Sequence, residues 1–357
     1  MKKIFVTTIV LFVCAFSLFA QNNLQPLATV KINKSETITL GQLKSRVDLY
    51  QRQTGTTLTV EQKKEILNAM IDEKLVVQSA AKAGITLTDA QVNEYYLNSL
   101  AQMVGRQVTE NEFAEMIKAE MGKTYEVFMK EQTGMTVAEY KKYLKEQMVA
   151  NQYILSLKEK EVNAVTVSDD EVRNFYEINR TSFVQSDTLR MLLVIAKKSG
   201  DSSAAKTRAT TLNSDLKAKK TTPEKIKQGS GSGYDAGDFY VAKNATAAAQ
   251  LGMNYNDLLE MFKKDKGFIS EVTETDTDFQ FWQILEKHDA KMLGLSDVAQ
   301  PGTSYTVYEY IKENLKNQKQ SQVLAAGVSE LTKSLRADSK NFKIEKKGDA
   351  LEKILTW

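Results

Sequence analysis

The chain is poor in the residues that carry most metal and acid–base chemistry. Its 357 residues include one cysteine, one histidine and three prolines. These counts exclude zinc sites built from clusters of cysteine and histidine, and a Ser-His-Asp triad would have to use His288 itself. His288 lies in the polar segment EKHDAK, directly after an apolar run, where we expect a solvated surface histidine. The composition therefore predicts neither a metal site nor a histidine-dependent active site.

The sequence also lacks the signals of nucleotide and nucleic-acid binding. A P-loop needs the pattern GxxxxGK[ST]; in the nearest match, Gly122-Lys123-Thr124, the first glycine is replaced by Ile117. The formal net charge is only +3, from 48 basic and 45 acidic residues, which argues against a basic stripe for nucleic acid. We expect no cofactor, no nucleotide and no nucleic-acid partner.

The first 20 residues differ from the rest of the chain. Lys2 and Lys3 precede the apolar run IFVTTIVLFVCAFSLFA, which ends at the small residue Ala20 and is followed by polar QNNLQ. A basic start, a short apolar segment and a small residue at its exit are typical of a secretory signal peptide. We expect residues 1–20 to be cleaved and the protein to be exported. A retained membrane anchor and lipidation at Cys14 stay open as alternatives.

Residues 35–180 follow a helical pattern almost throughout. The capping-box motif Ser/Thr-x-x-Glu/Gln recurs at Thr39–Gln42, Thr59–Gln62, Thr88–Gln91, Thr109–Glu112, Thr136–Glu139, Ser168–Glu171 and Thr306–Glu309. In QKKEILNAMIDEKLVVQSAAKAG the apolar residues lie on one helical face, and Gly84 is placed to end the helix. We predict five to seven helices here, preceded by a short strand over residues 28–33 (ATVKIN).

Beyond about residue 185 the pattern changes to mixed strands and helices. We predict a buried strand over 188–198, a helix over 202–219, a glycine-rich loop over 229–244, a helix over 255–264 and strand pairs over 267–287. A long helix follows, with Val307, Ile311, Leu315, Leu324, Val328, Leu331 and Leu335 on one broad face. Such a face must dock on another part of the protein. NFKIEKK, near the end of the chain, predicts a short strand.

Four segments together carry a resemblance to a known family. They are ATVKINKSETITLGQLKSRV, EILNAMIDEKLVVQSAAKAGITLTDAQVNEYY, TGMTVAEYKKYLKEQMVANQYI and VTVSDDEVRNFYEINRTSFVQSDTLRMLLVIAKK. In this order and spacing they resemble the SurA/PrsA-type extracytoplasmic chaperones, from about residue 27 to 345, with residues 103–130 as an insertion. The resemblance implies an α+β fold. Residues 21–185 and 290–357 would form a mainly helical chaperone domain, and residues 186–289 an inserted parvulin-like domain.

The implied parvulin-like domain departs from the pattern of active parvulin-type prolyl isomerases. The run Gly233 to Phe239 (GYDAGDF) resembles the family's GGDLGWF-like turn in degenerate form, although a plain linker stays open as an alternative. The family's two site histidines align with Leu193, in LRMLLVIA, and with Gln280, in DFQFWQI. Leu193 can neither donate nor accept a hydrogen bond, and Gln280 lacks the imidazole. The resemblance therefore implies a domain that has lost most of its catalysis, and we expect no catalytic residue.

Family position places an apolar groove, a candidate substrate-binding pocket, near five residues: Leu193, Phe239, Met253, Tyr255 and Gln280. The alternative is that these residues are simply core. The resemblance implies an ATP-independent periplasmic holdase chaperone for unfolded or nascent exported proteins, such as aromatic-rich outer-membrane proteins in transit. An active peptidyl-prolyl isomerase and a structural envelope scaffold stay open as alternatives. The sequence does not indicate the oligomeric state.

Overall fold

The computed structural model describes residues 23–198 and 201–357. The predicted signal peptide and Cys14 lie outside these residues. The chain divides into two compact units, one formed by Met1–Val165 with Lys319–Trp357 and the other by Thr166–Gln318. Among the described residues, no helix combines the length and apolar character needed to cross a membrane.

The first unit consists of helices around a small antiparallel sheet. Its helices are α2 (Leu40–Thr54), α3 (Val60–Lys82), α4 (Asp89–Val104), α5 (Glu110–Met121), α6 (Tyr125–Thr133), α7 (Val137–Asn163), α14 (Asp349–Leu355) and the C-terminal part of α13 (Val307–Ala337). The sheet has the order β2 (Glu36–Thr39), β1 (Pro26–Val30) and β9 (Phe342–Ile344). Because β9 pairs with β1, segments from opposite ends of the chain share one sheet.

The helix starts follow the predicted capping boxes. At all six predicted boxes between Thr39 and Ser168, the side chain of the capping residue accepts from the backbone N–H three residues on, and the return bond is also made. Thr306 and Glu309 make the same pair of bonds at the start of α13. These bonds satisfy N–H groups that the first helical turn leaves without partners.

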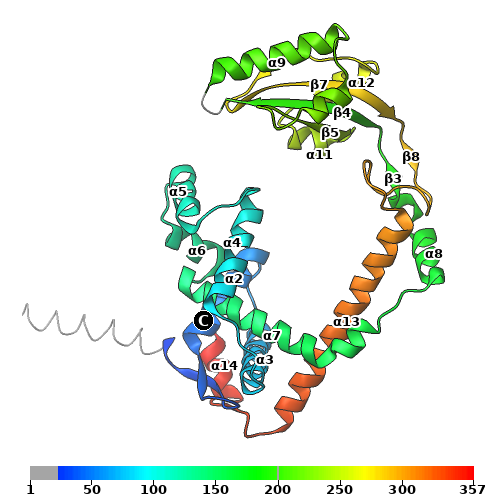
Figure 1. Cartoon of the computed structure of the whole chain (residues 1–357). Helices are drawn as coiled ribbons and strands as arrows, with labels where there is room; N and C mark the ends of the chain where they lie inside the picture. The colour runs from blue at the N-terminus through cyan, green and yellow to red at the C-terminus, as the bar shows by residue number, and fades with distance from the viewer. Residues whose placement is uncertain (1–22, 199–200) are drawn as a thin grey trace, which may run out of the picture. The chain divides into compact units, whose positions relative to one another are not determined.

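The core of the first unit joins both ends of the chain. Leu27, Leu43 and Ile71 are fully buried in one cluster with Leu355 from α14, and α14 lies beside α3 (Figure 1). A second cluster, centred on Tyr96 and Phe113, is formed by helices α4 to α7. The predicted apolar face of α13 is only partly docked on this core. Leu335 packs on the first cluster, whereas Val328 is 41% exposed.

The second unit contains a four-stranded antiparallel sheet in the order β5 (Asp235–Ala242), β4 (Thr188–Lys197), β7 (Asp278–His288) and β6 (Thr273–Glu274). Helix α9 (Ser202–Lys217) packs on one face with α10 (Pro223–Gln228), and α11 (Ala245–Gln250) and α12 (Tyr255–Lys263) pack on the other (Figure 1). The unit also includes α8 (Asp169–Ile178), a 3₁₀ turn (Arg180–Ser182), the pair β3 (Val184–Gln185) with β8 (Lys291–Met292), and the start of α13.

The fold class is confirmed as mainly helical α+β, but several predicted elements need correction. The first strand ends at Val30, and the segment before α2 forms a strand, β2. Residues 235–239, predicted as part of a turn, form the start of β5 because they pair along β4. Helix α14 was not predicted. His288, which we expected at the surface after an apolar run, is the last residue of strand β7, and its side chain is 38% exposed.

The compact units also differ in extent from the predicted domains. Residues 166–185 and 290–318 lie in the second unit, whereas the sequence analysis grouped them with the N-terminal helices. The physical reason is a separate core cluster in which Tyr176, Leu293 and Val307 are buried together. The predicted division into a chaperone domain and an inserted parvulin-like domain stays a prediction.

Candidate functional site

Three of the five predicted pocket residues lie on one face of the sheet in the second unit. Leu193 of β4 stands opposite Gly237 of β5 and Trp282 of β7. Phe239 stands opposite Met191, and Gln280 opposite Ile195. Because side chains alternate along a strand, Leu193, Phe239 and Gln280 point to the same side. The shared face follows from the alternation of side chains along each strand together with the pairing of the strands.

The other two residues lie at or beside α12, one of the helices that cover part of this face. Met253 lies between α11 and α12 and packs against the cluster that contains Leu258 of α12, as Phe239 also does. Tyr255 begins α12 and is 43% exposed. None of the five predicted residues is fully buried, so all of them retain some accessible surface.

The sheet face has apolar chemistry around Leu193. The Trp282 ring, beside Leu193 in register, lies 5.5 Å from the ring of Phe268, which is 37% exposed. The next row on this face, which contains Gln280 and Ile195, holds Asp235, whose carboxylate lies 2.9 Å from the Lys197 amino group. The two rows that contain Leu193 and Phe239 hold no titratable side chain. These rows can therefore contact an apolar group, but they offer no side chain that would transfer a proton.

Of the two aspartates in the segment from Gly233 to Phe239, Asp238 points away from this face. Asp238 accepts hydrogen bonds from Arg190 and Lys227 at 2.8 and 2.9 Å. Burial raises the pKa of Asp238, but the bonds from Lys227 and Arg190 outweigh this effect and lower it overall. Asp238 stands opposite Leu192 in β4, next to Leu193 and so on the other side of the sheet. It holds β5 to its neighbours.

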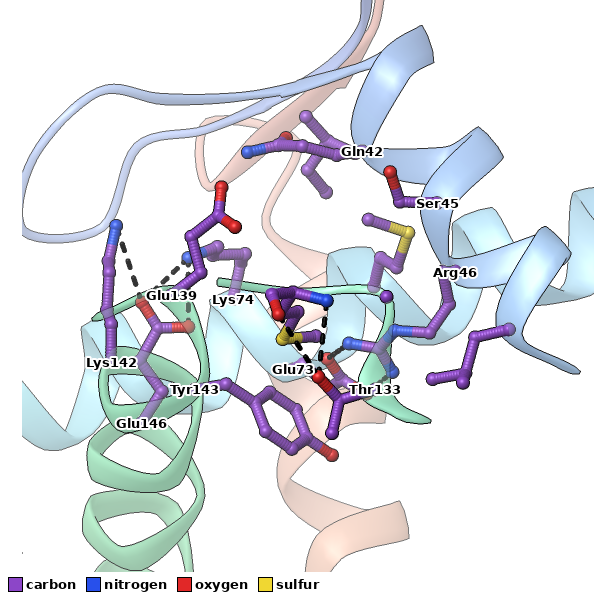
Figure 2. A pocket seen from close by; sticks show the side chains of 15 residues that line it. Gln42, Ser45, Arg46, Glu73, Lys74, Thr133, Glu139, Lys142, Tyr143 and Glu146 are labelled. Carbon is purple, nitrogen blue, oxygen red and sulfur yellow. Dashed lines mark hydrogen bonds and ion pairs between the residues drawn. The ribbon is translucent and has the colours of Figure 1, made fainter. Parts of the chain in front are cut away.

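A cavity of about 270 Å³ lies in the first unit, and the sequence analysis missed it. Figure 2 shows its side chains, with Arg46 on one side and Lys142 and Glu146 on the other. We call it the N-terminal cavity. Its walls come from α2, α3, the turn between α6 and α7, and the first turns of α7. The lining includes the apolar side chains of Leu49, Met70, Met135 and Tyr143.

Local sequence signals build the wall formed by α7. Gly134 ends α6 in the left-handed region, at φ 73°, which favours glycine. Thr136 then caps α7 and receives the return contact of Glu139. Helical spacing brings Glu139, Tyr143 and Glu146 to the same side of α7, because residues three and four apart lie on one face.

The charges of the N-terminal cavity are paired with one another. Arg46 donates to both carboxylate oxygens of Glu73, each at 3.1 Å, and its guanidinium lies 5.3 Å from the centre of the Tyr143 ring. Lys74 lies between Glu146 and Glu36, at 3.0 and 3.1 Å. A bidentate Arg–carboxylate pair has a fixed geometry. These pairs therefore hold α2, α3 and α7 together around the apolar side chains.

Burial and pairing act in opposite directions on Lys74. Burial lowers the pKa of its amino group, but the nearby carboxylates of Glu146 and Glu36 outweigh this and raise the pKa overall. Lys74 is therefore charged at neutral pH. The cavity offers a ligand apolar surface bordered by fixed charges.

The sequence missed the N-terminal cavity because its walls are far apart in the chain. They come from residues 38–49, 70–74 and 133–146, and none of these segments carries a binding motif by itself. The last segment directly follows residues 103–130, which the sequence analysis treated as an insertion. One signal in the sequence could have indicated this cavity. Met70 and Met135 are flexible apolar residues within or beside segments of regular helical pattern.

Comparison with known proteins identifies the first part of the chain. Residues 1–103 match the family model described as the SurA-like N-terminal domain. This part of the chain is therefore similar to the SurA-like N-terminal domain. Two walls of the N-terminal cavity, residues 38–49 and 70–74, lie within this SurA-like domain, and the third lies beyond it.

A curated relative extends the similarity. Over 187 residues the chain is 29% identical to the foldase protein PrsA of Clostridium acetobutylicum, which is 52% of this chain and 51% of that protein. The chain thus spans about half the length of the curated relative it matches. The predicted resemblance to the SurA/PrsA-type chaperones is confirmed.

Solved structures give weaker matches over more of the chain. A SurA-like chaperone of Campylobacter jejuni is 17% identical, with 90% of this chain and 100% of that chain covered and a TM-score of 0.33. The foldase protein PrsA of Streptococcus pneumoniae is 14% identical, with 90% and 96% covered and a TM-score of 0.29.

Proposed function

We propose that the protein is an ATP-independent holdase chaperone, exported to the periplasm, that binds unfolded polypeptides in transit. The observation that carries the proposal is the N-terminal cavity, where Met70, Met135 and Tyr143 face an accessible space between fixed ion pairs. Methionine side chains are flexible and polarizable, and they suit surfaces that accept many partners. The SurA-like domain that forms two of the cavity's walls supports the same function.

The clients we propose are unfolded exported proteins rich in aromatic residues, such as outer-membrane proteins. An aromatic side chain can fill apolar space beside methionine sulfur, an arrangement that is favourable by about 0.3–1.5 kcal/mol. The paired charges at the border would remain hydrated while the apolar group enters. Binding of this kind is reversible without nucleotide, because it depends on many weak contacts.

We also propose that the parvulin-like part of the second unit is not a prolyl isomerase. Leu193 and Gln280 occupy the positions that the resemblance assigns to histidines, and the titratable side chain in the row of Gln280, Asp235, is paired with Lys197 at 2.9 Å. Isomerisation must overcome a barrier of about 18–20 kcal/mol. The alternative is an active isomerase, and the feature that favours it is the exposed ring of Phe268 beside the half-buried Trp282, an apolar surface suited to a proline ring. A peptide assay of cis/trans isomerisation separates the two, because we expect the uncatalysed rate.

The chaperone proposal is tested by dilution of a urea-unfolded outer-membrane protein into buffer without nucleotide. We expect the full chain to suppress aggregation measured by light scattering, and Met135→Glu to weaken the suppression because it places a charge among the apolar walls. Met121→Glu is the matched control, since Met121 is 51% exposed and lies outside the cavity. Circular dichroism checks that both variants fold. A structural envelope scaffold would give no suppression with any form of the protein.

A further inference from the structure

A second cavity lies in the other unit, and neither the family resemblance nor the proposed function assigns it a role. It measures about 570 Å³ and is lined by α8, the turn after it, β3, the segment after β8 and the first turns of α13. We call it the neutral cavity, because none of its lining residues is charged. Small-ligand pockets usually measure about 300–1,000 Å³, so the volume is sufficient for a large side chain with some of its backbone.

Aromatic rings form much of the wall. Phe175 and Phe183 pack against the cluster that surrounds Val307, and Phe183 lies 5.6 Å from the Tyr176 ring. Tyr310 completes the lining and is 44% exposed. Aromatic pairs in offset or edge-to-face contact are favourable beyond the area that they bury. The wall therefore favours an aromatic group as the occupant.

Carboxamides supply the polar part of the lining. Asn179 already donates to the Phe175 carbonyl at 2.8 Å. For the side chains of Gln300 and Asn314 we find no hydrogen bond to any described residue, and both are exposed. A carboxamide both donates and accepts, so each can pair with a backbone amide of a bound peptide.

The surface beside the neutral cavity is apolar and open. Val184, which lines the cavity, is 53% exposed, and its partner across the β3–β8 pair, Met292, is 47% exposed. Grouped exposed apolar side chains are a feature of protein-interaction sites and of ligand-binding grooves. The two cavities differ in charge. The N-terminal cavity is bordered by Arg46, Lys74, Lys142 and three glutamates, whereas the neutral cavity has no charged lining residue.

We propose that the neutral cavity binds an uncharged aromatic side chain of an unfolded polypeptide, with the adjacent backbone amides held by Gln300 and Asn314. This inference rests on the proposed chaperone function and adds to it a second, chemically distinct binding site. An aromatic residue flanked by neutral residues fits the lining. An acidic or basic residue would be buried there without a partner, which is unfavourable.

The test uses the full chain and a short peptide, acetylated and amidated, with the sequence Gly-Ser-Bpa-Ser-Gly, where Bpa is the photoreactive benzoylphenylalanine. After irradiation, mass spectrometry locates the label. We expect label within residues 175–184 and 292–314, with competition by the same peptide carrying Phe in place of Bpa and none by the peptide carrying Glu. Label elsewhere, or equal competition by both peptides, overturns the proposal.

Two variants probe the lining itself. Tyr310→Ala should reduce the label about fivefold, the factor expected from loss of one aromatic contact, and Gln300→Ala should reduce it through the loss of a backbone contact. Tyr50→Ala is the matched control, since Tyr50 is 51% exposed and lines neither cavity. Unchanged labelling in both lining variants contradicts the proposal.

The outcome is separable from that of the chaperone assay. If aggregation is suppressed but the neutral cavity is not labelled, this inference fails and the proposed function stands. If the cavity is labelled but aggregation is not suppressed, the proposed function fails and the binding site stands.

Discussion

A buried lysine ties the last helix to the first unit. Lys63 of α3 is 4% exposed, and its Nζ donates to the carbonyl oxygen of Leu355 at 2.9 Å and to an oxygen of Trp357 at 2.7 Å. The same amino group lies 4.3 Å from the centre of the Trp357 ring. A lysine this deeply buried is rare unless it is paired. Here backbone oxygens and an aromatic face take the place of a carboxylate.

Replacement of Lys63 by methionine should destabilise the protein. The side chain keeps its length, but the buried Leu355 carbonyl oxygen and a partly buried oxygen of Trp357 lose their donor. We expect a loss of about 2 kcal/mol in the free energy of unfolding. Urea denaturation measures it. Lys82→Met, at an exposed position on the same helix, should cost under about 0.5 kcal/mol. Equal losses for the two variants would show that the buried bonds contribute nothing.

Glu36 predicts a pH dependence of stability. Its carboxylate contacts Lys34 at 2.6 Å and Lys74 at 3.1 Å. Burial raises the pKa of Glu36, but the two lysines outweigh it and hold the pKa below its ordinary value of 4.5. A carboxylate with a lowered folded-state pKa stabilises the fold above its unfolded pKa, and this stabilisation is lost as the pH falls through the folded pKa.

The free energy of unfolding should therefore decrease as the pH is lowered from about 6 to about 3.5, and part of this decrease should be absent in Glu36→Gln. Urea denaturation at both pH values of the wild type and the variant gives the comparison. Glu61→Gln serves as control, because the Glu61 side chain is 74% exposed and lies 3.9 Å from its partner Lys64. Identical pH dependence in the wild type and Glu36→Gln would rule out this role of Glu36.

At the scale of elements, helix α7 shows how a local signal shapes a binding surface. Thr136 accepts from the N–H of Glu139 at 3.2 Å and donates its own N–H to the Glu139 carboxylate at 2.8 Å. The capped turn directly follows Met135, which lines the N-terminal cavity. Stability and the proposed client binding are thus linked at one helix start.

Thr136→Ala should cost about 1 kcal/mol of stability, the usual effect of losing an N-cap. It should also weaken aggregation suppression, because the turn that positions Met135 becomes less ordered. Thr136→Ser retains the hydroxyl and should restore both properties. Denaturation and light scattering on the same preparations test this. Failure of serine to restore stability would assign the effect to the lost methyl group instead.

The elements that could be predicted are those with local causes. Capping residues gave the starts of seven helices, and a continuous apolar run gave the strand containing Leu193. The strand β2, the helix α14 and the start of β5 could not be predicted, because each forms through pairing or packing with distant segments. The same distinction holds for the sites. Family position grouped Leu193, Phe239 and Gln280, and strand pairing places them on one face, whereas both cavities are assembled from segments far apart in the sequence.

At the scale of the whole molecule, each unit has its own core and its own cavity. The first unit joins the SurA-like domain to the last 39 residues through the sheet β2-β1-β9 and the docked helix α14. The second unit combines the four-stranded sheet β5-β4-β7-β6 with the neutral cavity. Helix α13 is continuous from one unit into the other, since it begins at Val307 and ends at Ala337. The two cavities differ in charge, so they would select different parts of one client.

Photocrosslinking tests the central claim most directly. The claim is that unfolded polypeptide is held at the N-terminal cavity and not only by the four-stranded sheet of the second unit. Benzoylphenylalanine replaces one residue at a time: Met135 or Leu49 in the cavity, Leu193 in the sheet, or exposed Met121 as a control. Each variant is irradiated in the presence of a urea-unfolded outer-membrane protein. The account predicts strong crosslinks from Met135 and Leu49 without nucleotide, and background levels from Met121. Crosslinks from Leu193 alone would contradict it.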